Sequence, residues 1–228
     1  MPQNRKRSLP RISLNKLGEY LVAKPGRRHT IIRNQKAPKK FIVARYPDAV
    51  RAIQRHITEE HENPDQLNKA IRTLSTANHE SKWKQETASL CAKALFAFMS
   101  IADEVPTNGY KAIKGEDSPE KMRLKGVDVS VRPEILLVDP DHNDQIVGGI
   151  KFHLGKGKEL GDSADFIGSV LYRYLAEVLS NEASVSHKNC FVVDVFAGEI
   201  YMAPRAYKRN MNDVSAACKE ISALWTAL

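Results

Sequence analysis

The pattern of hydrophobic and polar positions divides the chain into a helical first part and a mixed second part. Up to about residue 104, apolar residues recur at intervals of three or four, which is typical of amphipathic helices. Helices are predicted over residues 13–23, 27–35, a stretch that begins near Asp48, 66–77 and 81–104, whereas residues 1–12 are expected to be disordered. The centre of the last helix is apolar nearly all round, which indicates a buried core helix.

From residue 110 onward the pattern becomes that of strands and two further helices. Residues 122–132 alternate between apolar and polar, and the apolar runs 133–139 and 145–154 flank a polar turn. A helix over 163–181, strands within 189–204 and a closing helix that begins at Asn212 and Asp213 complete the chain. The predicted fold is therefore α/β (α+β), with an α-β-β-β-α-β-α core domain over 81–228 and a basic helical extension over 1–80.

The two apolar runs predict a hairpin with a specific register. A turn centred on His142 and Asn143 pairs residues whose numbers sum to 285, so Glu134 faces Lys151 and Leu136 faces Gly149. Opposed residues share one face of a sheet, and a slip of one residue would move Lys151 to the other face. We expect Gly149 to leave room for a ligand beside the two charges. The alternative is an ordinary cross-strand ion pair.

The same residues resemble a known family. The element order, Pro133-Glu134 at the start of one strand and Gly149-Ile150-Lys151 on the next resemble the PD-(D/E)XK, or restriction-endonuclease-like, nuclease superfamily over about residues 80–205. The segment is also similar to a group of bacterial proteins to which no role is assigned. The motif is degenerate, because the second acid of the family falls at Gly149, which cannot bind a metal.

The resemblance implies a nuclease that uses Mg²⁺ or Mn²⁺ to hydrolyse phosphodiester bonds. Glu134 would be a metal ligand and Lys151 its cationic partner, since hard cations prefer carboxylate oxygens. The missing acid could come from Glu80 or Glu86 on the preceding helix, or from Asp128. If none of them reaches the site, the resemblance implies an inactive relative that acts as a DNA-binding or protein-interaction module.

The distribution of charge points to a polyanionic partner. The formal net charge is +8, but residues 1–45 hold thirteen Lys and Arg against Glu19 alone, which is +12 and leaves −4 for the rest. Apolar residues are interleaved with these charges, which favours a binding surface for nucleic acid, with DNA expected, over a solvated tail. The candidate nucleic-acid-binding residues are Arg27, Arg28, Arg33, Lys36, Lys39 and Lys40, together with Lys156 and Lys158 in a later loop.

Composition excludes several other classes of protein. No run of 18 apolar residues is present, and the N-terminal residues lack the apolar stretch of a secretory signal. The cysteines Cys91, Cys190 and Cys218 are odd in number and lie in apolar neighbourhoods, which predicts buried free thiols in a cytoplasmic protein. A homodimer and a role as a protein–protein adaptor remain open alternatives at this point.

Overall fold

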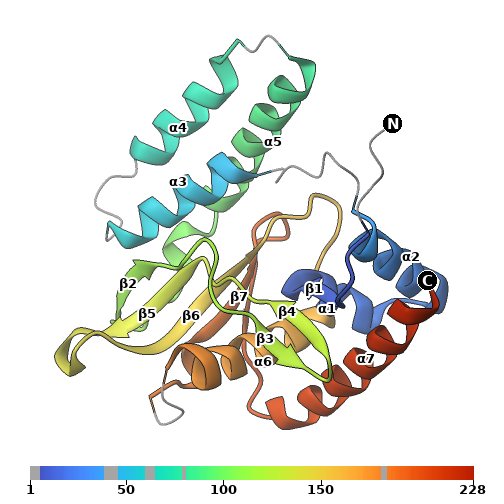
Figure 1. The fold of residues 1–228 in the computed structure, drawn as a ribbon. Helices are drawn as coiled ribbons and strands as arrows, with labels where there is room; N and C mark the ends of the chain where they lie inside the picture. Colours follow the sequence, from blue (N-terminus) through green and yellow to red (C-terminus); the bar gives the residue numbers. More distant parts are fainter. Residues whose placement is uncertain (1–5, 39–45, 60–64, 79–80, 181–183) are drawn as a thin grey trace.

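The structure, a computed structural model, is built on two β-sheets. It describes residues 6–38, 46–59, 65–78, 81–180 and 184–228. The larger sheet has five strands in the order β2-β5-β6-β7-β8, and the smaller one has three in the order β1-β4-β3 (Figure 1). The large sheet comprises β2 (Lys111–Lys114), β5 (Ile135–Asp139), β6 (Gln145–His153), β7 (Cys190–Asp194) and β8 (Glu199–Met202). The small sheet comprises β1 (Arg11–Ser13), β3 (Met122–Leu124) and β4 (Val127–Ser130).

Helices cover both faces of the large sheet, and two of them extend away from it as an arm. The helices are α1 (Leu14–Val22), α2 (Pro25–Lys36), α3 (Pro47–Thr58), α4 (Asp65–Thr76), α5 (Lys82–Met99), α6 (Ser163–Tyr174) and α7 (Tyr207–Ala227). Helix α6 continues into a π-helical turn, Leu175–Leu179. The antiparallel pair α4 and α5 forms the arm at the top of Figure 1.

The strand directions follow from the connections between the strands. β5 is antiparallel to both β2 and β6, whereas β6 and β7 are parallel. A parallel pair needs a crossover, and α6 supplies it between β6 and β7. β7 and β8 are joined by a tight turn and are antiparallel. The mixed α/β architecture of the sequence prediction is therefore confirmed, with the small sheet and one face of the large sheet sharing a hydrophobic cluster.

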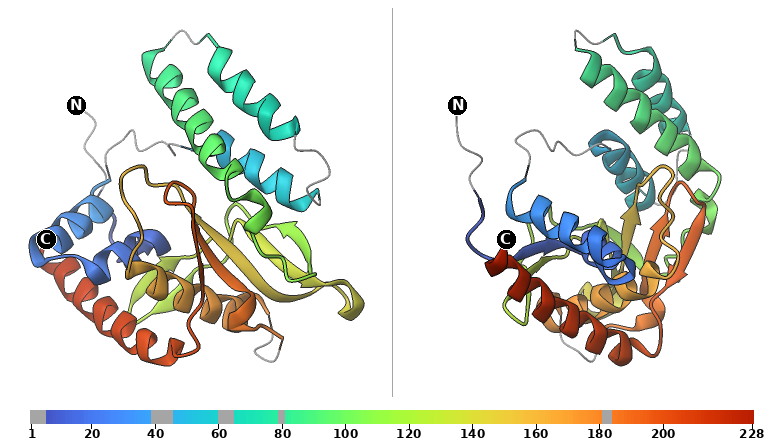
Figure 2. Two further views of the ribbon diagram at one scale, coloured as in Figure 1. Left: turned by 180° about the vertical axis from the view of Figure 1, so that it is seen from behind. Right: turned by 90° about the vertical axis from the view of Figure 1, so that its right-hand side faces the viewer.

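Two hydrophobic clusters lie on opposite faces of the large sheet. Ile135, Leu137 and Ile150 belong to the cluster that contains the buried residues of α3 and α5. Leu136, the residue between the first two, belongs to the cluster formed with α1, α6, α7 and the small sheet. Figure 2 shows these two layers of helices from the side and from behind. Successive side chains from Ile135 to Leu137 therefore point to opposite faces of the sheet, as the geometry of a β-strand requires.

The prediction of a single strand over residues 122–132 is wrong. Residues 122–132 form not one strand but the hairpin β3–β4, which turns at Lys125 and Gly126, both with positive φ (47° and 84°). This hairpin belongs to the small sheet. The first strand of the large sheet is instead β2, whose four residues KAIK were not predicted as a strand. β2 is an edge strand with two exposed lysines, so its short sequence carries little hydrophobic signal.

The N-terminal segment is more ordered than predicted. Within the described part of residues 1–12, Arg11 and Ile12 belong to β1, which pairs in parallel with β4. The region 1–80 does not pack as one extension, because α1 and α2 join the cluster of α6 and α7, whereas α3 and α4 pack with α5. Helix α7 also begins earlier than predicted, at Tyr207 and not at Asn212.

The prediction that the cysteines are buried is confirmed. Cys91, Cys190 and Cys218 are all buried thiols outside any disulfide. Burial raises the pKa of Cys190 to about 12 and that of Cys218 to about 11, because a thiolate is poorly solvated in an apolar surrounding. Among the helices of the described residues, none combines the length and the apolar character that crossing a membrane would require.

Candidate functional site

The predicted register of the β5–β6 hairpin is confirmed. Ile135 pairs with Ile150, and Leu136 pairs with Gly149, so the facing residues sum to 285. A bulge between Leu137 and Val138 changes the sum near the turn, where Asp139 faces Gln145. The bulge lies beyond the charged pair, so Glu134 and Lys151 keep the predicted opposition.

Glu134 and Lys151 form a largely buried ion pair. Lys151 Nζ lies 2.5 Å from Glu134 Oε1, and the side chains of Lys151 and Glu134 are 10% and 15% exposed. Both side chains lie on the face of the sheet opposite to Ile135 and Ile150, which join the cluster of α3 and α5. The two charges therefore face the layer that contains α1 and α6.

Backbone groups complete the hydrogen bonding of the pair. The second carboxylate oxygen of Glu134 accepts a bond of 2.7 Å from the backbone N–H of Phe152, and Lys151 Nζ also donates to the carbonyl of Arg132 at 2.8 Å. Gln54, on α3, donates to the carbonyl of Glu134 at 2.9 Å. Each carboxylate oxygen of Glu134 thus has a protein partner, which is the arrangement a buried charge needs to be tolerated.

The space beside Gly149 is filled. A Cβ atom added to Gly149 would lie 2.9 Å from the carbonyl oxygen of Ile135 and 3.1 Å from Leu175 Cδ1. The expectation of room for a ligand at Gly149 is therefore wrong. The glycine is needed because the carbonyl of Ile135 on the neighbouring strand and Leu175 of the π-helical turn both approach β6 closely here.

The two proposed additional metal ligands that the structure describes do not join Glu134. Glu86 is exposed on α5, which packs on the other face of the sheet and begins at the outer end of the arm (Figure 1). Asp128 lies in the small sheet, where its Oδ1 is 3.8 Å from Nη1 of Arg123. Glu80 lies outside the described residues.

The donor set at Glu134 does not fit Mg²⁺ or Mn²⁺. Such an ion needs free carboxylate oxygens, and those of Glu134 are bound by Lys151 and the N–H of Phe152. Across the described ranges there is no group of three or more His, Cys, Asp and Glu side chains that could hold a metal ion. The geometry at this position is that of a structural ion pair between neighbouring strands.

Several predicted nucleic-acid-binding residues make contacts within the protein. Arg28 donates to the carbonyls of Tyr20, Leu21 and Ala23, and its guanidinium lies 5.2 Å from the centre of the Tyr20 ring. Arg28 Nη1 also lies 3.2 Å from Glu220 on α7.

Two other basic residues of α2, Arg27 and Lys36, also make contacts within the protein. Arg27 is paired with Glu19, and Lys36 Nζ donates to the carbonyl of Trp225 at 2.6 Å. These contacts attach α2 to α1 and to α7.

Three further predicted basic residues are exposed. Arg33 on α2 and Lys156 and Lys158 in the loop after β6 have exposed side chains, and none of the three forms an ion pair with another described residue. Lys39 and Lys40 lie outside the described residues. Of the six predicted basic residues that the structure describes, three are therefore exposed without an ion-pair partner.

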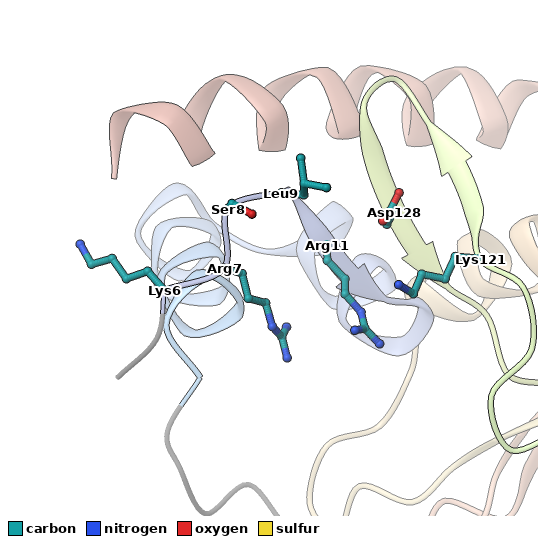
Figure 3. Close-up of a pocket in the computed structure, with 7 residues that line it drawn as sticks. All are labelled: Lys6, Arg7, Ser8, Leu9, Arg11, Lys121 and Asp128. Atoms are coloured by element: carbon teal, nitrogen blue, oxygen red, sulfur yellow. The ribbon is translucent and has the colours of Figure 1, made fainter. Parts of the chain in front are cut away.

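A second basic feature, not predicted from the sequence, is a cavity of about 420 Å³ at the edge of the small sheet. We call it the arginine pocket (Figure 3); its lining residues are Lys6, Arg7, Ser8, Leu9, Arg11, Lys121 and Asp128. The first basic residues were expected in a disordered arm, and Lys121 was not selected. The signal in the sequence was the alternation Arg11-Ile12-Ser13, which is too short to separate a strand from a loop.

Comparisons with known proteins give no family for this chain. No protein-family model matches the sequence, and a search of curated proteins finds no match. The assignment of function therefore rests on the sequence and the structure themselves.

Proposed function

We propose that this chain is a nucleic-acid-binding protein with a restriction-endonuclease-like core in which the nuclease motif has become structural. The observation that carries the proposal is the occupancy of Glu134, whose two carboxylate oxygens are bound by Lys151 Nζ and by the N–H of Phe152. Binding, without hydrolysis, is the function that this arrangement supports best.

The order of elements supports the core that the resemblance implies. Helix α5 is followed by β2, β5 and β6, then by α6 and β7, and these strands are neighbours in sequence order in one sheet. The β3–β4 hairpin is inserted between β2 and β5. Glu134, the residue before β5, and Lys151, within β6, are the two residues that the resemblance assigns to the family motif.

The charge of the protein supports a polyanionic partner. The formal net charge is +8, and exposed cations remain on α2, in the loop after β6 and around the arginine pocket. Contacts to phosphates supply most of the affinity of non-specific nucleic-acid binding and make it sensitive to salt. DNA is the expected ligand, and RNA of the same length is the comparison.

Fluorescence anisotropy with labelled duplex DNA and RNA at several salt concentrations tests the binding. Incubation of both nucleic acids with Mg²⁺ or Mn²⁺ tests hydrolysis, and calorimetric titration with Mn²⁺ alone tests metal binding. We expect salt-dependent binding, intact nucleic acid and no Mn²⁺ binding.

Two results would contradict the proposal in different ways. Metal-dependent cleavage that is lost in Glu134→Gln, in a variant with an unchanged circular-dichroism spectrum, would establish the alternative of a Mg²⁺- or Mn²⁺-dependent nuclease. Absence of binding to both nucleic acids at low salt would instead favour a protein-interaction module. Light scattering in the same buffers distinguishes a monomer from a homodimer.

A further inference from the structure

We propose that the arginine pocket binds a backbone phosphate of nucleic acid, with Arg11 and Lys121 as its principal ligands and Arg7 beside them. This inference rests on the proposed nucleic-acid-binding function and assigns it a specific contact site. Arg7 and Arg11 belong to the basic segment 1–45 that the sequence singled out, but neither they nor Lys121 were among its individually named candidate residues.

The geometry of the arginine pocket is suited to an oxyanion. The side chains of Arg7 and Arg11 extend in the same direction, and Lys121 approaches from the residue before β3 (Figure 3). A guanidinium presents several N–H donors in one plane, which matches the oxygens of a phosphate group. The cavity of about 420 Å³ is large enough to hold one phosphodiester group with part of its sugar.

The electrostatics of the pocket favour an anion. Four cationic side chains line it against one carboxylate, so its formal charge is 4 − 1, or +3. The carboxylate, Asp128, is already paired with Arg123 on the neighbouring strand. Partial burial and the positive charge of Arg11 both lower the pKa of Arg7, although an arginine remains protonated at neutral pH.

Within the described part of the chain, the two principal ligands have no competing partner. Neither Arg11 nor Lys121 makes a side-chain hydrogen bond or an ion pair within 4 Å to another described residue. This separates them from Arg28 and Lys36, which are used to attach α2 to the rest of the fold. Unpaired cations that repel one another gain most from a bound phosphate.

The backbone that presents these side chains is held in place. Arg7 N–H donates to the carbonyl of Lys36 at 2.8 Å, its carbonyl accepts from Trp225 Nε1 at 3.3 Å, and its Nη1 donates to the carbonyl of Gln35 at 3.2 Å. The N–H of Asp128 donates to the carbonyl of Pro10, and β1 pairs with β4. A site held in this way loses little conformational entropy on binding.

The charge continues beyond the pocket, which favours a chain of phosphates over a single ion. Arg11, Asp128 and Arg123 occupy one register row across β1, β4 and β3. Neighbouring strands are about 4.8 Å apart, so Arg123 lies about 10 Å from Arg11 along this row. Lys125, at the exposed end of the β3–β4 hairpin, extends the cationic edge further.

The test compares Arg11→Gln and Lys121→Gln with a control that changes the net charge equally. Arg72→Gln is the control, because Arg72 is exposed on α4 in the arm, away from the small sheet (Figure 1). Anisotropy with labelled duplex DNA gives the affinity and its salt dependence for each variant. Removal of one phosphate contact should reduce the slope by about 0.9 and the affinity at ~0.1 M salt roughly fivefold to tenfold.

The expected result is that both pocket variants show this loss, that the double variant shows a larger one, and that Arg72→Gln binds like the wild type. If all three substitutions reduce the affinity for DNA equally, or if none does, the phosphate site is overturned. The proposed function still stands in that case, because the wild type binds nucleic acid. Wild-type protein that binds no nucleic acid would overturn both. Each variant is also tested for binding to phosphatidylserine vesicles. If the pocket variants lose vesicle binding while their affinity for nucleic acid is unchanged, the pocket is a membrane-surface contact and the proposal is wrong. Circular dichroism and thermal unfolding confirm that each variant is folded.

Discussion

Lys151, on β6, and Glu134, directly before the adjacent strand β5, are joined at 2.5 Å with little exposure to water. In the sequence the pair resembled a catalytic motif, and in the structure each partner has a second bond to the backbone. A buried pair of this kind adds little net stability compared with apolar residues, but the removal of one partner leaves a charge without compensation.

The first prediction concerns the stability of this pair. Lys151→Met should lower the free energy of unfolding by about 3 kcal/mol, because the Glu134 carboxylate would stay buried without its cation. The double variant Glu134→Gln/Lys151→Met should recover part of this loss, since both charges are gone and the introduced amide oxygen can still accept from the N–H of Phe152. Urea denaturation measures all three proteins.

The control for this pair is Lys114→Met on β2. Lys114 is paired with Asp117, whose side chain is 85% exposed. An exposed pair contributes little, so we expect a change below about 1 kcal/mol. If Lys114→Met and Lys151→Met destabilise the protein equally, the Glu134–Lys151 pair has no special structural role.

The second prediction compares two arginines of α2, Arg28, which makes contacts within the protein, and Arg33, which is exposed. Arg28→Ala should lower the free energy of unfolding by about 1–3 kcal/mol, because the carbonyls of Tyr20, Leu21 and Ala23 lose the hydrogen bonds of its guanidinium. Its nucleic-acid affinity, measured well below the melting temperature, should stay close to that of the wild type. Arg33→Ala should leave stability unchanged within about 0.5 kcal/mol. A drop in affinity in Arg28→Ala without a drop in stability would contradict this division.

The third prediction concerns Asp194, which is 1% exposed at the end of β7. Its Oδ2 accepts from the N–H of Leu160 at 2.9 Å, and its Oδ1 accepts from the N–H of Ala197 at 3.4 Å. Asp194→Ala should cost about 1–3 kcal/mol, since a buried N–H would lose its acceptor.

Hydrogen exchange provides a local measurement for the same residue. The amide of Leu160 should exchange much faster in Asp194→Ala, and Asp194→Asn should retain part of the protection because its amide oxygen can still accept. Asp213→Ala, at an exposed position on α7, serves as the control and should leave the Leu160 amide protected. Equal exchange in wild type and Asp194→Ala would show that the loop is held by other contacts.

The fourth prediction is a dependence of stability on pH from Cys190. Burial raises the pKa of this thiol to about 12, whereas an unfolded cysteine titrates near a pH of about 8.5. Because the unfolded state then loses its proton first, this contribution to stability is complete below about pH 8.5. It falls as the pH rises, by up to about 1.4 kcal/mol per pH unit.

Comparison with Cys190→Ala isolates this contribution from lysine and tyrosine titration. The difference in unfolding free energy between wild type and variant should shrink between about pH 8 and about pH 10. A difference that stays constant over this range would mean that Cys190 does not remain protonated in the folded state.

The sequence by itself determined most of the helices and the pairing of Glu134 with Lys151. The helices followed from three-to-four periodicity, and the β5–β6 register followed from period two and the position of the turn. That register was sufficient to bring Glu134 and Lys151 together, because a short hairpin leaves few alternative pairings. The burial of Cys190 likewise followed from its apolar neighbours.

Only the tertiary structure decided what these residues can do. Whether Gly149 leaves a void depends on Leu175, and whether Lys36 is free depends on the carbonyl of Trp225, which is 189 residues away in the chain. The arginine pocket requires β1 to pair in parallel with β4, which lies far along the chain. Such contacts are set by the packing of whole elements against one another, and local periodicity carries no information about them.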